Sequence, residues 1–152
     1  FLSFLLSFFL LLSFFSRLTS DHYGGLTKKW EAGPIYVSNV TANLVRAQLG
    51  VPEHFLCRLP LEEPVTVDGV TVTLVDANHC PGMRGDSVLM PELLLTSMWP
   101  AGAVVILFQL PDGRKYLHTG DFRATSALWT HPTIAQASID SLYLDTVRKK
   151  EE

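Results

Sequence analysis

Residues 65–75 constrain the fold most, because they join strand-forming composition to an obligatory turn. The segment reads VTVDGVTVTLV, in which two runs rich in β-branched residues flank Asp68 and Gly69. An Asp-Gly pair favours the two-residue turn of a β-hairpin, since both central residues need a positive φ. The sequence therefore predicts an antiparallel hairpin over 65–75, around which the rest of a sheet is built.

Other segments extend this hairpin into an α/β pattern. Residues 41–49 have helical spacing, and Gly50 follows as a fitting helix stop. Four further segments have the composition and length of strands: 34–38, 104–110, 114–119 and 139–144. Many short strands with few helices suggest a sandwich of sheets with helices outside.

Composition narrows the class of protein. The 152 residues leave room for one modest domain, and a chain that is 47% hydrophobic is not a disordered tail. A net charge of −3 excludes nucleic-acid binding driven by bulk positive charge, so such binding needs a local basic patch or a metal. Cys57 and Cys80 form neither a disulfide framework nor a zinc knuckle, which favours a reducing compartment.

Residues 1–16 contain only Phe, Leu and Ser, including six of the nine phenylalanines of the chain. A signal peptide or membrane anchor lacks its basic flank here, and the run is shorter than the roughly 20 residues of a spanning helix. A buried core helix is the second interpretation, although no helical or strand period is visible. We favour a third, a translated polypyrimidine tract before a splice acceptor, because all-pyrimidine codons encode these residue types.

Histidine and aspartate residues lie in predicted turns and at the ends of predicted strands. These candidates are Asp21, His22, His79, Asp121 and Asp145. Carboxylates and imidazoles are the ligands of Zn²⁺, Mn²⁺ and Fe²⁺, and a shared site would activate water for hydrolysis. Each residue alone is more often a turn or capping residue, or a structural histidine. A metal site and a purely structural role therefore both remain open on the residues alone.

Four motifs occur in order along the chain: SDHYGGL at 20–26, DANHCPG at 76–82, HTGDFRA at 118–124 and LYLDT at 142–146. Together they closely resemble the DNA cross-link repair nucleases, the Artemis-like β-CASP branch of the metallo-β-lactamase superfamily. The resemblance is nearest to the cross-link repair 5′-exonuclease members. It implies an α/β fold, namely the N-terminal half of a metallo-β-lactamase αββα sandwich without the β-CASP domain.

The resemblance also implies an activity and its setting. Members of the family are nuclear, metal-dependent 5′-to-3′ DNA exonucleases of interstrand cross-link and double-strand-break repair, acting on DNA with a free 5′ end. The implied cofactor is zinc, as one or two ions, with Mg²⁺ or Mn²⁺ as alternatives. Protein partners and substrate-binding residues are not identified by the motifs.

Motif position implies a role for each candidate residue. His79 is expected to bind a first metal, Asp121 to bridge two metals, and Asp21, His22 and Asp145 to bind the second. Asp21 and Asp121 are the candidate catalytic residues. Cys80 and His118 belong to the motifs but are expected to be structural.

Three departures from the family pattern divide the chain. Arg17 and Thr19 occupy the first two positions of the family's His-x-His-x-Asp-His motif, so the first metal keeps fewer than the three protein ligands of a catalytic zinc site. We expect a low-complexity segment at 1–19, a partial domain at 20–146 with an insertion at 83–102, and a charged tail at 147–152. Such abrupt departures favour a partial gene model with translated introns.

Two classes of function remain open at this point. In the first, the gene encodes the nuclease and this fragment is itself inactive and poorly soluble. In the second, the chain is a non-catalytic, membrane-tethered or interaction-only fragment, although no membrane is expected unless residues 1–16 are real. A third alternative is another metallo-β-lactamase-fold hydrolase, against which Asp145 and the NHCPG motif favour the DNA branch.

Overall fold

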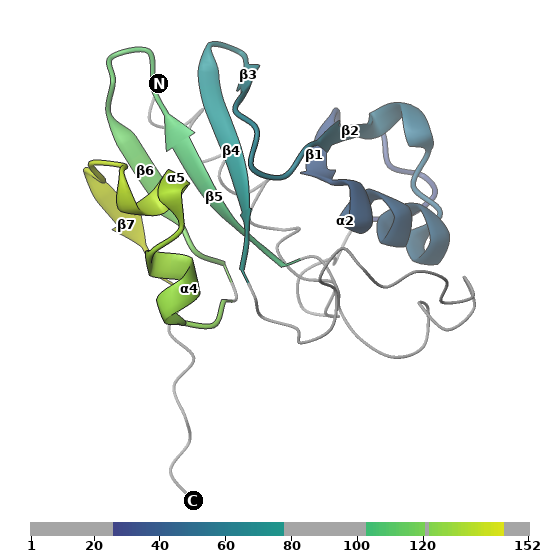
Figure 1. Ribbon diagram of the computed structural model, residues 1–152. Coiled ribbons are helices and arrows are strands. Elements are labelled where there is room, and N and C mark those ends of the chain that lie inside the picture. The colour runs from purple at the N-terminus through teal and green to yellow at the C-terminus, as the bar shows by residue number, and fades with distance from the viewer. Residues whose placement is uncertain (1–25, 78–102, 121, 145–152) are drawn as a thin grey trace, which may run out of the picture.

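The computed structural model describes residues 26–77, 103–120 and 122–144 (Figure 1). Their strands form a two-stranded sheet, in the order β1-β2, and a five-stranded sheet, in the order β3-β4-β5-β6-β7. The strands are β1 Ile35–Ser38, β2 Leu56–Leu59, β3 Val65–Val67, β4 Val70–Asp76, β5 Val104–Gln109, β6 Lys115–His118 and β7 Ser141–Tyr143. The helical segments are α2 Asn39–Leu44, η1 Val45–Leu49, η2 Glu53–Phe55, α4 Ser126–Trp129 and α5 Pro132–Ala135. The mixed α/β class expected from the sequence is confirmed.

The predicted hairpin is present as β3 and β4, which pair antiparallel with Val67 opposite Val70. Asp68 and Gly69 have φ values of 47° and 82°, as a type I′ turn requires. A Cβ on Gly69 would meet nothing nearer than Cγ of Pro111 at 4.0 Å. The glycine is therefore required by the backbone conformation and not by a lack of space.

The directions of the strands in the large sheet bring the carboxyl ends of three strands to one edge. Strands β4, β5 and β6 are successively antiparallel, and β7 is parallel to β6. Strands β4, β6 and β7 therefore run in the same direction and end at the same edge, which is the lower one in Figure 1. The β3–β4 and β5–β6 turns lie at the opposite edge. We call the edge where β4, β6 and β7 end the exit edge.

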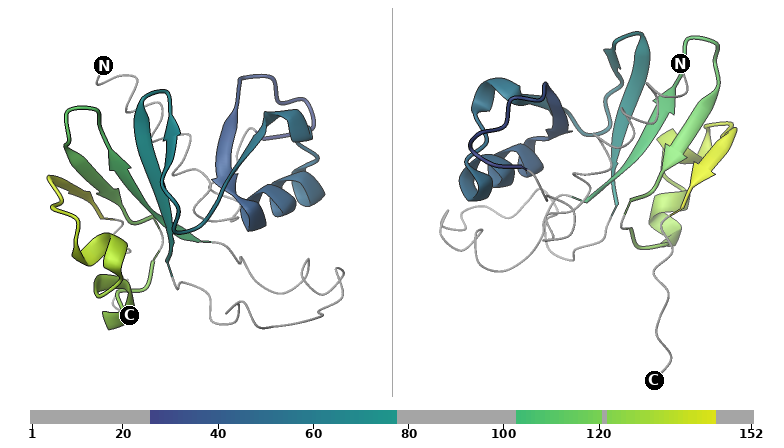
Figure 2. Two further views of the ribbon diagram at one scale, coloured as in Figure 1. Left: turned by 45° about the horizontal axis from the view of Figure 1, so that its top comes forward. Right: turned by 180° about the vertical axis from the view of Figure 1, so that it is seen from behind.

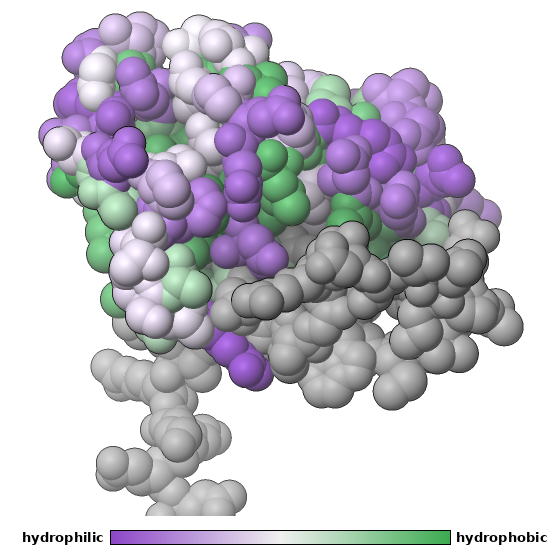
Figure 3. Space-filling view, viewed as in Figure 1, coloured by the Kyte–Doolittle hydropathy of each residue, from purple (hydrophilic) through white to green (hydrophobic). Residues whose placement is uncertain are grey.

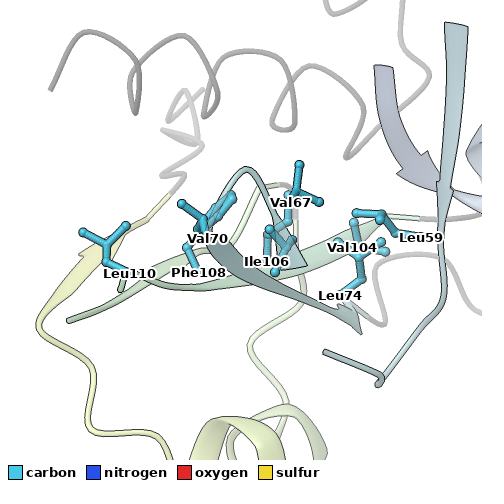
Figure 4. Packing of buried hydrophobic residues seen from close by; sticks show 9 residues of the cluster. Leu59, Val67, Val70, Leu74, Val104, Ile106, Phe108 and Leu110 are labelled. Atoms are coloured by element: carbon cyan, nitrogen blue, oxygen red, sulfur yellow. The ribbon is translucent and has the colours of Figure 1, made fainter. Parts of the chain in front are cut away.

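Both faces of the large sheet are covered, which explains the continuous apolar run of β5. Val104, Ile106 and Phe108 face a cluster that includes Leu59 of the small sheet (Figure 4). The alternate residues of β5 belong to a second cluster that includes Leu128 of α4 and Ile134 of α5.

A third cluster joins the small sheet to its helix, through Ile35 and Val37 of β1 with Ala42 of α2 and Val45 of η1. The order of layers is therefore helix, large sheet, small sheet, helix, and the two views of Figure 2 show the helical segments on the outside.

The predicted helix begins two residues earlier than expected, at Asn39, because Ser38 both ends β1 and caps α2. The Ser38 Oγ accepts a hydrogen bond from the Thr41 backbone N–H at 3.2 Å. The helix widens into a π turn over Val45–Leu49 and stops at Gly50, whose φ is 68°. The stop expected at Gly50 is confirmed.

Strand β2 pairs parallel to β1 and had no counterpart in the expected elements. One arginine on β2 joins this strand to η2 and α2. The Arg58 Nη2 and Nε donate to Oε1 of Glu53 at 2.9 and 3.0 Å, and Nη1 donates to Oδ1 of Asn43 at 2.9 Å. These contacts fix the small sheet against its helix.

Candidate functional site

The predicted metal ligands Asp21, His22, His79, Asp121 and Asp145 lie outside the described residues. Cys80, Arg17 and Thr19, the inserted segment 83–102 and the tail 147–152 also lie outside them. Within the described ranges, no group of three or more His, Cys, Asp or Glu side chains could hold a metal ion. The described residues that flank the motifs still show where the chain leaves the two sheets toward these predicted ligands.

Three of the four motifs begin in the last residues of strands that end at the exit edge, and their predicted metal ligands come after the strand ends. Strand β4 is followed by Ala77, two residues before His79, and β6 is followed by Thr119 and Gly120, directly before Asp121. Strand β7 is followed by Leu144, directly before Asp145. Polar residues that follow strands of the same direction start from one edge of the sheet, so the chain leaves all three strands on the same side.

Backbone hydrogen bonds join these exits to one another. The Arg123 N–H donates to the Ala77 carbonyl at 3.2 Å, so the segment after β6 is bonded to the end of β4. The Ala77 N–H donates to the Ala103 carbonyl at 3.1 Å. The Thr119 N–H donates to the Tyr143 carbonyl at 3.0 Å, and the Thr119 Oγ1 donates to the same oxygen at 3.3 Å. At the exit edge, backbone hydrogen bonds therefore link the end of β4 to the segment after β6, and the end of β6 to the end of β7.

His118 is held among structural contacts at the end of β6. Its Nδ1 accepts a hydrogen bond from the Gly120 backbone N–H at 3.1 Å, which leaves the imidazole proton of the neutral ring on Nε2. Its ring stacks on Tyr143 with centroids 6.2 Å apart and an interplanar angle of 15°. Burial lowers the pKa of His118 below its ordinary value. These contacts fit the structural role expected for His118.

The lowered pKa of His118 predicts a loss of stability in acid. The folded chain holds the ring neutral, whereas the unfolded chain takes up a proton as the pH falls below about 6.5. The contribution of His118 to the stability of the folded chain is therefore present in full above that pH. It declines as the pH falls toward the lower pKa that His118 has in the folded chain. We measure the free energy of unfolding in denaturant at about pH 7.5 and at about pH 5.5. Between these two pH values we expect this free energy to fall less in His118→Gln than in the wild-type chain. An equal difference in both proteins would contradict this expectation.

The motif at 20–26 leads into a different layer of the fold. Leu26 is the first described residue after Asp21 and His22, and it is buried in the cluster of the small sheet with Ile35 and Val45. Lys28 and Lys29, which follow, are exposed. The chain therefore enters the small-sheet layer directly after this motif, whereas the other three motifs begin on strands of the large sheet.

An aromatic pair beside the exit edge was not expected from the sequence. The rings of Phe122 and Trp129 meet edge-on, with centroids 5.9 Å apart and an interplanar angle of 79°. Trp129 is 40% exposed, and the neighbouring Arg123 is also exposed. Helix α4 has only four residues, so no periodicity in the sequence could indicate this placement.

No helix within the described ranges is long and apolar enough to cross a membrane. Residues 1–16, for which a membrane anchor is one interpretation of the sequence, lie outside those ranges.

Comparison with curated proteins gives strong sequence similarity, although no protein-family model matches the chain. The DNA cross-link repair protein SNM1 of Arabidopsis thaliana is 41% identical over 133 residues, which is 88% of this chain and 23% of that protein. The DNA cross-link repair 1A protein of Homo sapiens is 41% identical over 133 residues, or 88% of this chain and 11% of that protein. The 5′ exonuclease Apollo of Gallus gallus is 37% identical over 135 residues, or 88% of this chain and 25% of that protein. The chain spans a quarter or less of the length of each of these relatives.

Proposed function

The chain is homologous to one part of the DNA cross-link repair nucleases, and from this premise we propose that it is a segment of a metal-dependent 5′-to-3′ DNA exonuclease. The proposed substrate is DNA with a free 5′ end, the proposed process is interstrand cross-link and double-strand-break repair, and the proposed location is the nucleus. The observation that carries the proposal is the exit edge, where three strands of one direction stop just before motif residues. Sequence identity near 40% supports the assignment of those motifs.

The layers of the fold support a finer assignment of the architecture. We propose that residues 20–146 are the N-terminal half of a metallo-β-lactamase αββα sandwich, with an insertion at 83–102. The succession of helix, large sheet, small sheet and helix is what such a half-sandwich requires. The segments 1–19 and 147–152 remain, in this proposal, additions outside that domain.

The residue types of the motifs fit a zinc ion, because carboxylate and imidazole are its ordinary ligands besides thiolate. The strand exits support the fit, since they bring the described neighbours of His79, Asp121 and Asp145 to one hydrogen-bonded edge. When bound, such an ion lowers the pKa of a water molecule and stabilises negative charge on a phosphodiester. The role of the chain itself is to supply the ligands and to orient them from fixed strands.

The two proposed ligand sets are unequal. The second-metal set contains Asp21, His22, Asp121 and Asp145, whereas the first-metal set retains only His79 and the shared Asp121. Three protein ligands are the usual minimum for a catalytic zinc site. We therefore propose that this chain binds one ion, at the second-metal set, and that its nuclease activity is little or none.

Zinc is expected to stabilise the chain through this set, by about 2.7 kcal/mol when the free ion is at a hundred times its dissociation constant. Asp121→Ala is expected to weaken this stabilisation, because it removes one of the four ligands of the second-metal set. Thermal unfolding with zinc and with a chelator measures the effect. Asp112→Ala serves as the matched control, because Asp112 lies in the β5–β6 turn at the opposite edge and pairs with Arg114 at 2.8 Å.

The zinc responses of the two variants distinguish a nuclease segment that binds a metal from a non-catalytic fragment that does not. A zinc response that is unchanged in Asp112→Ala and clearly smaller in Asp121→Ala supports the nuclease segment. A wild-type chain that does not respond to zinc, or equal responses in both variants, would favour the non-catalytic fragment.

A further inference from the structure

Arg123 differs from the other arginines in the described part of the chain. Arg46 and Arg58 pair with Glu53, and Arg114 pairs with Asp112. Among the ion pairs and hydrogen bonds of that part, none involves the Arg123 guanidinium, and the residue is exposed. This cation is therefore available to an anion from outside the chain.

The backbone on both sides of Arg123 is fixed. Its own N–H donates to the Ala77 carbonyl at 3.2 Å, and Phe122 packs against the buried cluster under α4. Thr125 caps α4, since its Oγ1 accepts a hydrogen bond from the Leu128 N–H at 3.4 Å. The guanidinium is thus carried by a short segment anchored at both ends beside the exit edge.

Trp129 lies on the same segment and presents an aromatic surface. It ends α4, and the edge-on contact of its ring with Phe122, the residue before Arg123, holds the indole at this place. Trp129 is 40% exposed, so part of its indole is accessible to a stacking partner. Figure 3 shows mostly pale surface of intermediate hydropathy over α4 and α5, in contrast to the mostly hydrophilic surface over β1, β2 and α2. An aromatic ring and a cation without a partner in the described part of the chain are therefore carried by one short segment, 122–129.

We propose that Trp129 and Arg123 bind single-stranded DNA, with a base stacked on the indole and a phosphate paired with the guanidinium. Base stacking on aromatic side chains and cation–phosphate contacts are the two general elements of single-strand binding. Arginine suits the second contact because its planar fork can pair with two phosphate oxygens. The choice of DNA as the ligand rests on the proposed function, whereas the site itself uses none of the proposed metal ligands.

Binding can be measured with the complete chain and a fluorescein-labelled single-stranded oligothymidylate, by fluorescence anisotropy in the presence of EDTA. We expect Trp129→Leu to weaken binding about tenfold, because leucine keeps an apolar contact with Phe122 but cannot stack. We expect Arg123→Gln to weaken binding several-fold and to reduce the salt dependence, by about 0.7 in the slope of log K against log salt.

Arg114→Gln is the matched control for charge, because it removes one guanidinium at the opposite edge of the same sheet. It is expected to leave both the affinity and the salt slope unchanged. Trp129→Phe keeps a ring against Phe122 and gives a second readout, since quenching of tryptophan fluorescence by the oligonucleotide should be lost in this variant.

Several results would overturn the proposal. These are no binding by the wild-type chain, equal effects of the two arginine variants, wild-type affinity in Trp129→Leu, or equal affinity for a duplex, whose stacked bases cannot use the indole. Because EDTA is present, the outcome is independent of the zinc test. Binding of the oligonucleotide without a zinc response would contradict the proposed function but support this site. A zinc response without binding of the oligonucleotide would support the proposed function but contradict this site.

Discussion

Replacing Phe108 with alanine is expected to lower the free energy of unfolding by about 3–5 kcal/mol. Phe108 is fully buried on β5, the central strand of the large sheet, between Val72 of β4 and Tyr116 of β6. It lies within the cluster that joins the two sheets (Figure 4). Alanine leaves a cavity that this close-packed surrounding can fill only in part. Because small domains have a total stability of about 5–15 kcal/mol, the variant should be marginally stable.

Chemical denaturation followed by circular dichroism measures this loss. The control is Gln109→Ala, since Gln109 is the next residue of the same strand and is exposed. We expect it to change the free energy of unfolding by no more than about 0.5 kcal/mol, as is usual for surface substitutions. Similar losses in both variants would mean that β5 does not form the centre of the core.

The double substitution Arg17→His and Thr19→His is expected to raise the zinc content from about one to about two ions per chain. It restores the His-x-His-x-Asp-His pattern, which adds two imidazoles to the first-metal set of His79 and Asp121. It also removes a guanidinium, which cannot ligate a cation and whose charge opposes one. Equilibrium dialysis with zinc, followed by metal analysis, gives the stoichiometry.

A control and a second readout make this result specific. Arg46→His and Lys28→His together also add two imidazoles, at exposed positions on the small-sheet layer, and should add no tightly bound ion. Nuclease activity on 5′-phosphorylated single-stranded DNA should be at most weak in the wild-type chain. Substantial wild-type turnover that Asp121→Ala abolishes would contradict the proposed inactivity of this segment.

Local chemistry explains which elements were predictable. The β3–β4 hairpin follows from Asp68 and Gly69, because an Asp-Gly pair specifies both the turn and the pairing of its flanks. The end of the helical segment follows from Gly50 for the same kind of reason. The helix start was misplaced by two residues because Ser38 belongs to a strand and caps a helix at once.

Long-range pairing explains which elements were not predictable. Strand β2 has no alternation, since Leu56 and Leu59 are buried and the two residues between them are partly buried. Its pairing with β1 joins segments far apart in the sequence, and parallel pairs carry no turn signature. Helices α4 and α5 have four residues each, which is too short for a visible period.

The candidate site also has features that the sequence predicts and features that only the folded chain reveals. The sequence placed Asp121 and Asp145 at strand ends, and β6 and β7 do end just before them. The shared direction of these strands depends on the parallel pairing of β6 with β7, which only the fold provides. The roles of the metal ligands stay predictions, because those residues lie outside the described ranges. The pairing of Phe122 with Trp129 likewise required the folded chain.

The hydrogen bond from Ala77 to Ala103 makes the β4–β5 connection thermodynamically tolerant of length. The two strands are in register up to Asp76 opposite Val104, and this bond extends the ladder by one more step. Whatever joins residues 77 and 103 is therefore closed at its base by the sheet itself. Each doubling of a flexible connection adds only about 0.6 kcal/mol of closure entropy. Strand pairing is therefore expected to persist when sequence is inserted or removed between residues 77 and 103.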